Sequence, residues 1–175
     1  MYRSKYILLL LCLLILPFKN GNAQQKALKG KALFGSLRAR HIGPAVMSGR
    51  ISAIDVVNSK PEIMYVGTAG GGLWKSNSAG ASLSPIFDDY TMSIGKIRID
   101  QQHPDTVWVG TGENVSGRHV AWGDGVYRSM DGGATWRQMG LSTSEHIGKI
   151  LVDPRDSDVV FVAAEGPLWS AGGER

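Results

Sequence analysis

The sequence contains three copies of one short pattern, and this repetition limits the possible folds more than any other feature. Each copy has two runs of mainly apolar residues, many of them β-branched or aromatic. The first runs are residues 50–57, 93–100 and 146–153, and the second runs are residues 64–68, 107–111 and 160–164. Corresponding positions lie 43 and 53 residues apart. Repeats of this size are typical of proteins that stack one small structural unit against the next.

Alternation along these runs predicts that they are β-strands. In residues 96–100, isoleucines alternate with charged residues, so one face of the strand is apolar and the other polar. A third, aromatic segment follows in each copy, at residues 73–76, 126–129 and 168–170. Four short strands in a repeat of this length are typical of a β-propeller blade. The alternative is a β-sandwich, which would not require such similar copies.

We therefore expect an all-β fold, a partial β-propeller with two four-stranded blades and part of a third. The predicted boundaries are residues 41–92 for blade 1, 93–145 for blade 2 and 146–175 for the incomplete blade 3. If the copies are equivalent, their inner strands must place the same apolar positions at the same points of each sheet. Those positions are Ile54, Ile97 and Ile150.

The N-terminus predicts export. Arg3 and Lys5 precede an apolar run at residues 7–16, and small residues occupy the positions that a signal peptidase requires. We expect a signal peptide at residues 1–23 and a leader segment at 24–40, in a secreted protein with no membrane span after cleavage. The alternative is an uncleaved membrane anchor, but a run this short would cover only about half of a bilayer core.

Removal of the signal peptide changes the charge and the chemistry that remain. It takes away three of the 19 basic residues and none of the 15 acidic ones, so the mature chain is close to neutral and gives no support for nucleic-acid binding. The single cysteine, Cys12, leaves as well, which excludes disulfides and a cysteine nucleophile. No metal site or cofactor is expected, because the histidines show no ligand spacing. They are His41, His103, His119 and His146.

One turn carries a specific motif. Residues 129–136 fit the Asp-box pattern S-x-D-x-G-x-x-W, with Ser129, Asp131, Gly133 and Trp136 at the fixed positions. The carboxylate can accept backbone N–H bonds in a tight turn, the glycine can take a left-handed conformation, and the tryptophan can fold back onto its own blade. We therefore interpret Asp131 as a structural residue and not as a catalytic acid. Residues 76–83 are a degenerate copy without the Asp and the Trp.

Beyond this motif, the chain resembles the N-terminus of a bacterial family of large secreted proteins. The matching segments are residues 44, 49–51, 65–68, 71–76, 85–89, 93–95, 107–113, 123–127 and 146–148. Members of this family carry BNR (Asp-box) repeats, are similar to the sortilin N-terminal propeller and are often labelled glycosyl hydrolases. The resemblance implies a fragment of a longer protein, whose missing C-terminal blades would complete the ring.

Candidate ligand-binding residues gather at one end of the predicted blades. The connection between the second and third strands shares this end with the segment that enters each blade, and blade 2 has an insertion in that connection. The candidates are Arg50, Glu113, Arg118, His119, Trp122 and Asp124. Carboxylates, cations and aromatic rings together suit a glycan or a peptide ligand, so our leading hypothesis is a binding module. The alternative is a solvated loop in which Glu113 pairs with Arg118.

A glycoside hydrolase is the rival hypothesis. Sialidases bind their substrate with three arginines, and only Arg50 lies at a plausible position. In propeller xyloglucanases a T-D-x-G-G turn that resembles residues 68–72 supplies one of the two catalytic acids, and here Ala69 takes the place of that acid. Any catalytic acids would therefore lie outside this chain. A third possibility is a marginally stable fragment whose exposed apolar faces make it associate.

Overall fold

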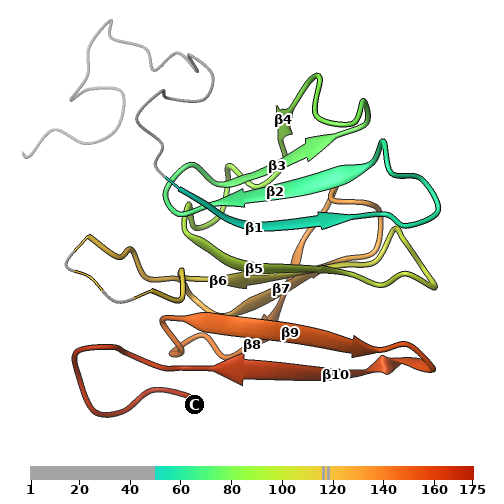
Figure 1. Ribbon diagram of the computed structural model, residues 1–175. Helices are drawn as coiled ribbons and strands as arrows, with labels where there is room; N and C mark the ends of the chain where they lie inside the picture. Colours follow the sequence, from blue (N-terminus) through green and yellow to red (C-terminus); the bar gives the residue numbers. More distant parts are fainter. Residues whose placement is uncertain (1–49, 116, 118) are drawn as a thin grey trace, which may run out of the picture. The chain divides into compact units, whose positions relative to one another are not determined.

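The structure, a computed structural model, describes residues 50–115, 117 and 119–175. In this part of the chain there are ten β-strands (Figure 1). They are β1 (Ile51–Val56), β2 (Met64–Thr68), β3 (Leu73–Ser76), β4 (Ser84–Pro85), β5 (Ile94–Ile99), β6 (Val107–Thr111), β7 (Val126–Ser129), β8 (Arg137–Gly140), β9 (Ile147–Asp153) and β10 (Asp156–Ala164).

Some predictions lie outside the described residues. These are the signal peptide at 1–23, the leader at 24–40, His41 and the candidate ligand-binding residue Arg118. Among the residues that are described, none belongs to a helix long and apolar enough to cross a membrane.

The strands form two four-stranded antiparallel sheets and one antiparallel pair. The orders are β1-β2-β3-β4, β5-β6-β7-β8 and β9-β10, so within each sheet a strand pairs with the next one along the chain. The inner strands β1, β5 and β9 lie side by side, with β5 in the middle (Figure 1). This is the arrangement of successive propeller blades, and it confirms the predicted all-β, partial β-propeller fold. We call the three units blades 1, 2 and 3.

The register confirms that the copies are equivalent. Ile54 pairs with Val66, Ile97 pairs with Val109, and Ile150 pairs with Val162. The register also shifts at the same place in blades 1 and 2, between Ile51 and Ala53 and between Ile94 and Lys96. The repeat in the sequence is therefore a repeat of hydrogen-bonded positions.

Neighbouring blades pack so closely that glycine is required between them. A Cβ atom on Gly67 in β2 would lie 2.5 Å from Cγ2 of Ile94 in blade 2, and one on Gly110 in β6 would clash in the same way with Ile147 in blade 3. Ile94 and Ile147 are fully buried in these contacts. The glycine in each second strand thus accommodates the isoleucine that begins the next blade.

The Asp box forms the hydrogen bonds that its sequence predicts. Asp131 Oδ1 accepts a bond from the backbone N–H of Thr135 at 2.9 Å, and Oδ2 accepts one from the Thr135 hydroxyl at 2.6 Å. The N–H of Gly133, whose φ is 93°, donates to Ser129 Oγ at 2.8 Å. The Asp131 carboxylate thus accepts its hydrogen bonds from within its own turn, as expected for a structural residue.

Trp136 differs from the prediction, because it contacts the preceding blade and not its own. Its Nε1 donates to the carbonyl of Ile86 at 2.9 Å, and its ring meets Phe87 edge-on at 5.2 Å between centroids. Nearby, the carbonyl of Gly132 accepts bonds from the hydroxyl of Tyr65 and the ammonium of Lys75. The turn therefore joins blade 2 to blade 1, since the indole finds its buried partner across the gap between sheets.

The prediction of a third strand at residues 168–170 was wrong. This segment is irregular, and β10 pairs only with β9. Residues 165–175 instead return to the connection between β8 and β9, where the carboxylate of Glu174 accepts bonds from the backbone N–H and hydroxyl of Thr143 at 3.1 Å. These contacts replace the strand pairing that Trp74 and Tyr127 make in the other two sheets.

Candidate functional site

The candidate site lies at the end of the sheets where the chain enters each inner strand, which we call the loop end. Three equivalent backbone hydrogen bonds join each entry to the loop after the second strand of the same blade. They run from Ala69 to Arg50 at 3.0 Å, from Gly112 to Ser93 at 2.8 Å, and from Glu165 to His146 at 2.9 Å. As predicted, entry segments and loops therefore share one end.

Glu113 and Arg50 form the central contact of this end. Both carboxylate oxygens of Glu113 lie 2.5 Å from Nη2 of Arg50, which enters β1. The Glu113 side chain is buried, whereas that of Arg50 is 47% exposed. The ion pair therefore joins blade 2 to blade 1 and leaves part of the guanidinium open to solvent. Arg118, the partner of Glu113 that we considered from the sequence, lies outside the described residues.

The backbone of Glu113 is fixed as well. Its N–H donates to Ser93 Oγ at 3.1 Å, and its carbonyl lies 2.9 Å from Nδ1 of His146, a buried residue that enters blade 3. Because a carbonyl oxygen can only accept, Nδ1 carries the proton in this contact. Glu113 thus contacts all three blades and holds the Arg50 guanidinium in a defined position.

Asp124 faces inward. Its Oδ2 accepts a hydrogen bond from the Tyr127 hydroxyl at 2.7 Å, and its backbone N–H donates to Thr111 Oγ1 at 2.8 Å. Burial, together with this hydrogen bond and the negative charge of Asp124, raises the pKa of the Tyr127 hydroxyl well above its usual value. The structure thus places this candidate where it anchors the end of the blade 2 loop on β7.

His119 and Trp122 face solvent in the same loop. Trp122 is 70% exposed, although the backbone on either side of it is held firmly. The carbonyl of Ala121 accepts a bond from Ser93 Oγ at 2.9 Å, and the N–H of Gly123 donates to the carbonyl of Glu145 at 2.7 Å. The Trp122 indole is therefore an exposed apolar surface, and hydrogen bonds on both sides hold its backbone in place.

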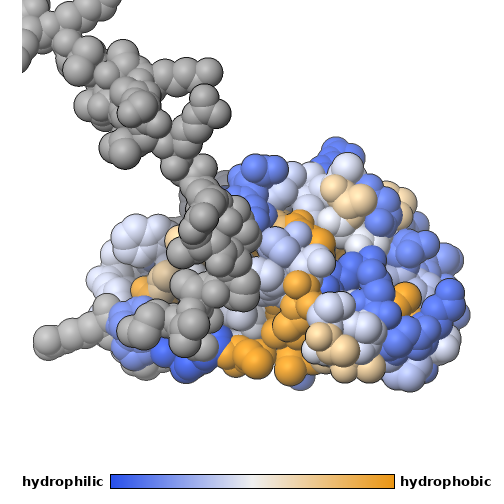
Figure 2. All heavy atoms as spheres, turned by 90° about the horizontal axis from the view of Figure 1, so that it is seen from above, coloured by the Kyte–Doolittle hydropathy of each residue, from blue (hydrophilic) through white to orange (hydrophobic). Residues whose placement is uncertain are grey.

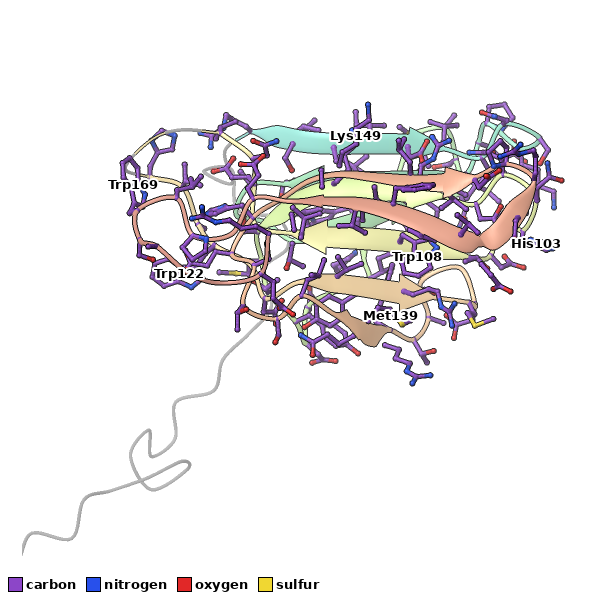
Figure 3. All side chains as sticks on the ribbon, turned by 90° about the horizontal axis from the view of Figure 1, so that it is seen from below. His103, Trp108, Trp122, Met139, Lys149 and Trp169 are labelled. Atoms are coloured by element: carbon purple, nitrogen blue, oxygen red, sulfur yellow. The ribbon has the colours of Figure 1, made fainter. Side chains whose placement is uncertain are left out.

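A second exposed tryptophan was missed by the sequence analysis. Trp169 is 73% exposed and lies at the same end as Trp122, whereas His103 lies at the opposite end (Figure 3). We had assigned Trp169 to a strand because it aligns with Trp74, which is buried against its neighbours. The segment that carries it contains Gly166, Gly172 and Gly173 at positive φ, and this glycine content was the available signal for a loop.

A cluster at the opposite end resembles a catalytic triad only in composition. The His103 Nδ1 atom lies 3.2 Å from Asp100 Oδ2 and 3.1 Å from Ser157 Oγ. A proton relay needs the acid and the nucleophile on different ring nitrogens, and here both contact the same one. In the described part of the chain, no three His, Cys, Asp or Glu side chains are close enough to hold a metal ion.

Comparison with known proteins supports the fold. No family model matches the chain, and no curated protein matches it. Among solved structures, a GH74 enzyme from Niastella koreensis is 20% identical over 65% of this chain, with a TM-score of 0.51. An ancestral GH74 enzyme is 19% identical over 68% of it, with a TM-score of 0.53. The GH74 xyloglucanase from Xanthomonas campestris is 18% identical over 72% of it, with a TM-score of 0.51.

The matches cover 17–20% of the chains of these three structures. At this level of identity the likeness concerns the fold. The chain is thus similar to part of a β-propeller of the kind found in GH74 enzymes, and its two four-stranded sheets and strand pair follow that architecture.

Proposed function

We propose that the chain is a glycan-binding propeller module, exported from the cytoplasm, whose ligand lies across the loop end. The observation that carries this proposal is the pair of exposed tryptophans, Trp122 and Trp169, at that end (Figure 3). Sugar rings have apolar faces that stack on aromatic rings, and their hydroxyls need polar partners beside the stacking surface. The half-exposed Arg50 guanidinium, held by Glu113, supplies hydrogen-bond donors for them.

Xyloglucan oligosaccharides are the natural first probe, since one of the similar structures is a xyloglucanase. Calorimetric titration should detect binding to the full chain. Trp122→Ala should weaken the affinity about tenfold, since loss of one stacked aromatic ring costs roughly 1–2 kcal/mol. Met130→Ala is the matched control, because Met130 is an equally exposed apolar side chain in the Asp-box turn. Equal affinities for both variants, or preferential binding of an extended peptide, would contradict the proposal.

Hydrolysis is the second candidate, favoured by the likeness to GH74 enzymes. The loop end of this chain offers little support for acid catalysis of its own. Ala69 is buried and has no proton to transfer, and the Glu113 carboxylate lies against a guanidinium. Catalytic acids would then belong to further blades of a longer protein. A longer protein with those blades should release reducing sugar from xyloglucan, and residues 1–175 alone should not.

A further inference from the structure

No described residue covers the outer face of blade 1 or the outer face of blade 3. On blade 1, Ile51 and Ile54 are 61% and 51% exposed, and Figure 2 looks onto that side of the sheet and shows apolar residues gathered in a patch. On blade 3, Leu151 and Phe161 are 45% and 62% exposed. We call these the leading face, on blade 1, and the trailing face, on blade 3.

The two internal interfaces show what each face is built to contact. In both, the trailing side of one blade meets the leading side of the next. Ile54 on the leading face has the register position of Ile97 and Ile150, which are both fully buried against the preceding blade. The leading face of blade 1 therefore has the composition of a surface that another blade covers.

The trailing face has the same relationship to buried positions. Phe161 has the register position of Tyr65 and Trp108, an aromatic residue in every blade. Tyr65 and Trp108 are buried by the following blade, and Phe161 is not. The two open faces are thus the two complementary halves of an interface that the chain already makes twice.

We propose that two copies of this chain associate head to tail, with the trailing face of each copy on the leading face of the other. A head-to-tail contact either closes into a ring or continues into an open filament. Two copies contribute four four-stranded blades and two β9–β10 pairs, which falls within the range of about four to eight blades that propellers contain. Closure at two copies covers both apolar faces of each chain, which removes them from water.

One residue makes this contact weaker than the internal ones. Ala163 occupies the position of Gly67 and Gly110, which accommodate an isoleucine of the next blade. In the dimer the partner's Ile51 has the register position of that isoleucine, so its side chain meets the Ala163 methyl group. The association should therefore be reversible and should depend on concentration.

Sedimentation equilibrium of the full chain tests this proposal. The wild-type mass should rise with concentration toward about twice the 18.8 kDa of one chain and then stop. Ile54→Lys and Phe161→Lys should each leave a monomer, because either one places a charge in the apolar contact. Met130→Lys, an exposed apolar position in the Asp-box turn, is the matched control and should dimerise as the wild type does. A wild-type monomer, or an oligomer that survives both substitutions, overturns the proposal.

Mixing the two monomeric variants separates a lost contact from a lost fold. The Ile54→Lys chain keeps a normal trailing face, and the Phe161→Lys chain keeps a normal leading face. An equimolar mixture should therefore recover dimers through the one intact interface, with a weaker affinity than the wild type. A mixture that remains monomeric overturns the head-to-tail geometry. Ala163→Gly should strengthen the wild-type dimer, and a weaker dimer would contradict the assigned register.

Discussion

Ser78 and Asp131 occupy the same position in two successive turns, and each accepts a hydrogen bond from the backbone N–H four residues later. The partners are Ser82 and Thr135, both at 2.9 Å. The hydroxyl of Ser82 lies 2.9 Å from Ser78 Oγ, as the hydroxyl of Thr135 lies close to the carboxylate. The degenerate copy of the Asp box therefore keeps its hydrogen bonds, with a neutral hydroxyl in place of the charge.

The charge in the intact copy makes stability depend on pH. Hydrogen bonds from the side chain and backbone of Thr135, and then from Ser129, lower the pKa of Asp131 to about 2 from an ordinary 3.8. The folded state thus takes up this proton less readily than the unfolded chain. The stabilisation is present above about pH 4 and is lost as the pH falls to 2.

Asp131→Asn should therefore lower the urea midpoint at pH 7 and reduce the loss of stability between pH 4 and pH 2. Unfolding curves at the three pH values measure this effect. Glu62→Gln, at an exposed position outside both turns, is the control and should retain the wild-type pH dependence. An unchanged pH dependence in Asp131→Asn would show that the turn carboxylate is not the group responsible.

Ala79 is strained in the degenerate turn. Its φ is 54°, close to the 67° of Gly132 at the same position in the Asp box. A Cβ atom in this left-handed conformation costs about 1 kcal/mol, so Ala79→Gly should stabilise the protein by roughly 0.5–1 kcal/mol. Ala81→Gly in the same turn should instead destabilise it slightly, because Ala81 has no positive φ. Thermal unfolding distinguishes the two variants, and equal shifts would contradict the strain.

The close packing between blades predicts a large effect of one methyl group. Gly110→Ala should destabilise the protein by roughly 1–3 kcal/mol, because the added Cβ would overlap Ile147 in the next blade. Gly70→Ala is the control, since a Cβ there meets nothing within 4 Å. Urea denaturation gives both values. If Gly110→Ala were as stable as Gly70→Ala, blades 2 and 3 would have to lie further apart than they do in this structure.

Tyr65 predicts a loss of stability at high pH. Burial, and then the negative charges of Asp105 and Asp131, raise the pKa of its hydroxyl from 10.0 to about 12. The protonated hydroxyl donates to the carbonyl of Gly132 at 3.1 Å. Stability from this group is therefore complete below about pH 10 and is lost as the pH rises toward 12.

Absorbance at 295 nm during an alkaline titration should show one tyrosine ionising near pH 12, and Tyr65→Phe should abolish that step. The control is Tyr90→Phe, at a partly exposed position. Retention of the late step in Tyr65→Phe would assign it to a different tyrosine.

The fold could be predicted from the sequence because each strand follows from a local alternation of apolar and polar residues, and the same alternation recurs in every copy. Alternation at Ile97 and Ile99 predicts a strand with one buried face, and the same pattern in each copy predicts equivalent sheets. The third strand of blade 3 was predicted incorrectly, although β10 offers it an unpaired edge. Trp169 aligns with Trp74, but its segment has glycines at positive φ at Gly166, Gly172 and Gly173, and this backbone conformation is not that of a strand.

The candidate site was predicted less completely, because its contacts join residues far apart in the sequence. Arg50 and Glu113 are 63 residues apart, and no spacing rule connects them. Asp124 accepts a hydrogen bond from the Tyr127 hydroxyl because of the path by which the loop returns to β7, and the composition of the loop does not determine this path. The exposure of Trp169 likewise depends on the absence of strand pairing around it in the described residues.

The attachment of the Asp-box turn to the preceding blade gives the array a direction. Trp136, Gly132 and Gly133 lie against groups that blade 1 must already have placed, among them the Ile86 carbonyl and the Tyr65 ring. Blade 1 is synthesised before blade 2, so the Asp-box hairpin of blade 2 can pack on a blade that has already folded. An amino-terminal truncation should therefore destabilise blade 2 more than a carboxyl-terminal truncation of equal length, because the Asp-box turn of blade 2 packs on blade 1.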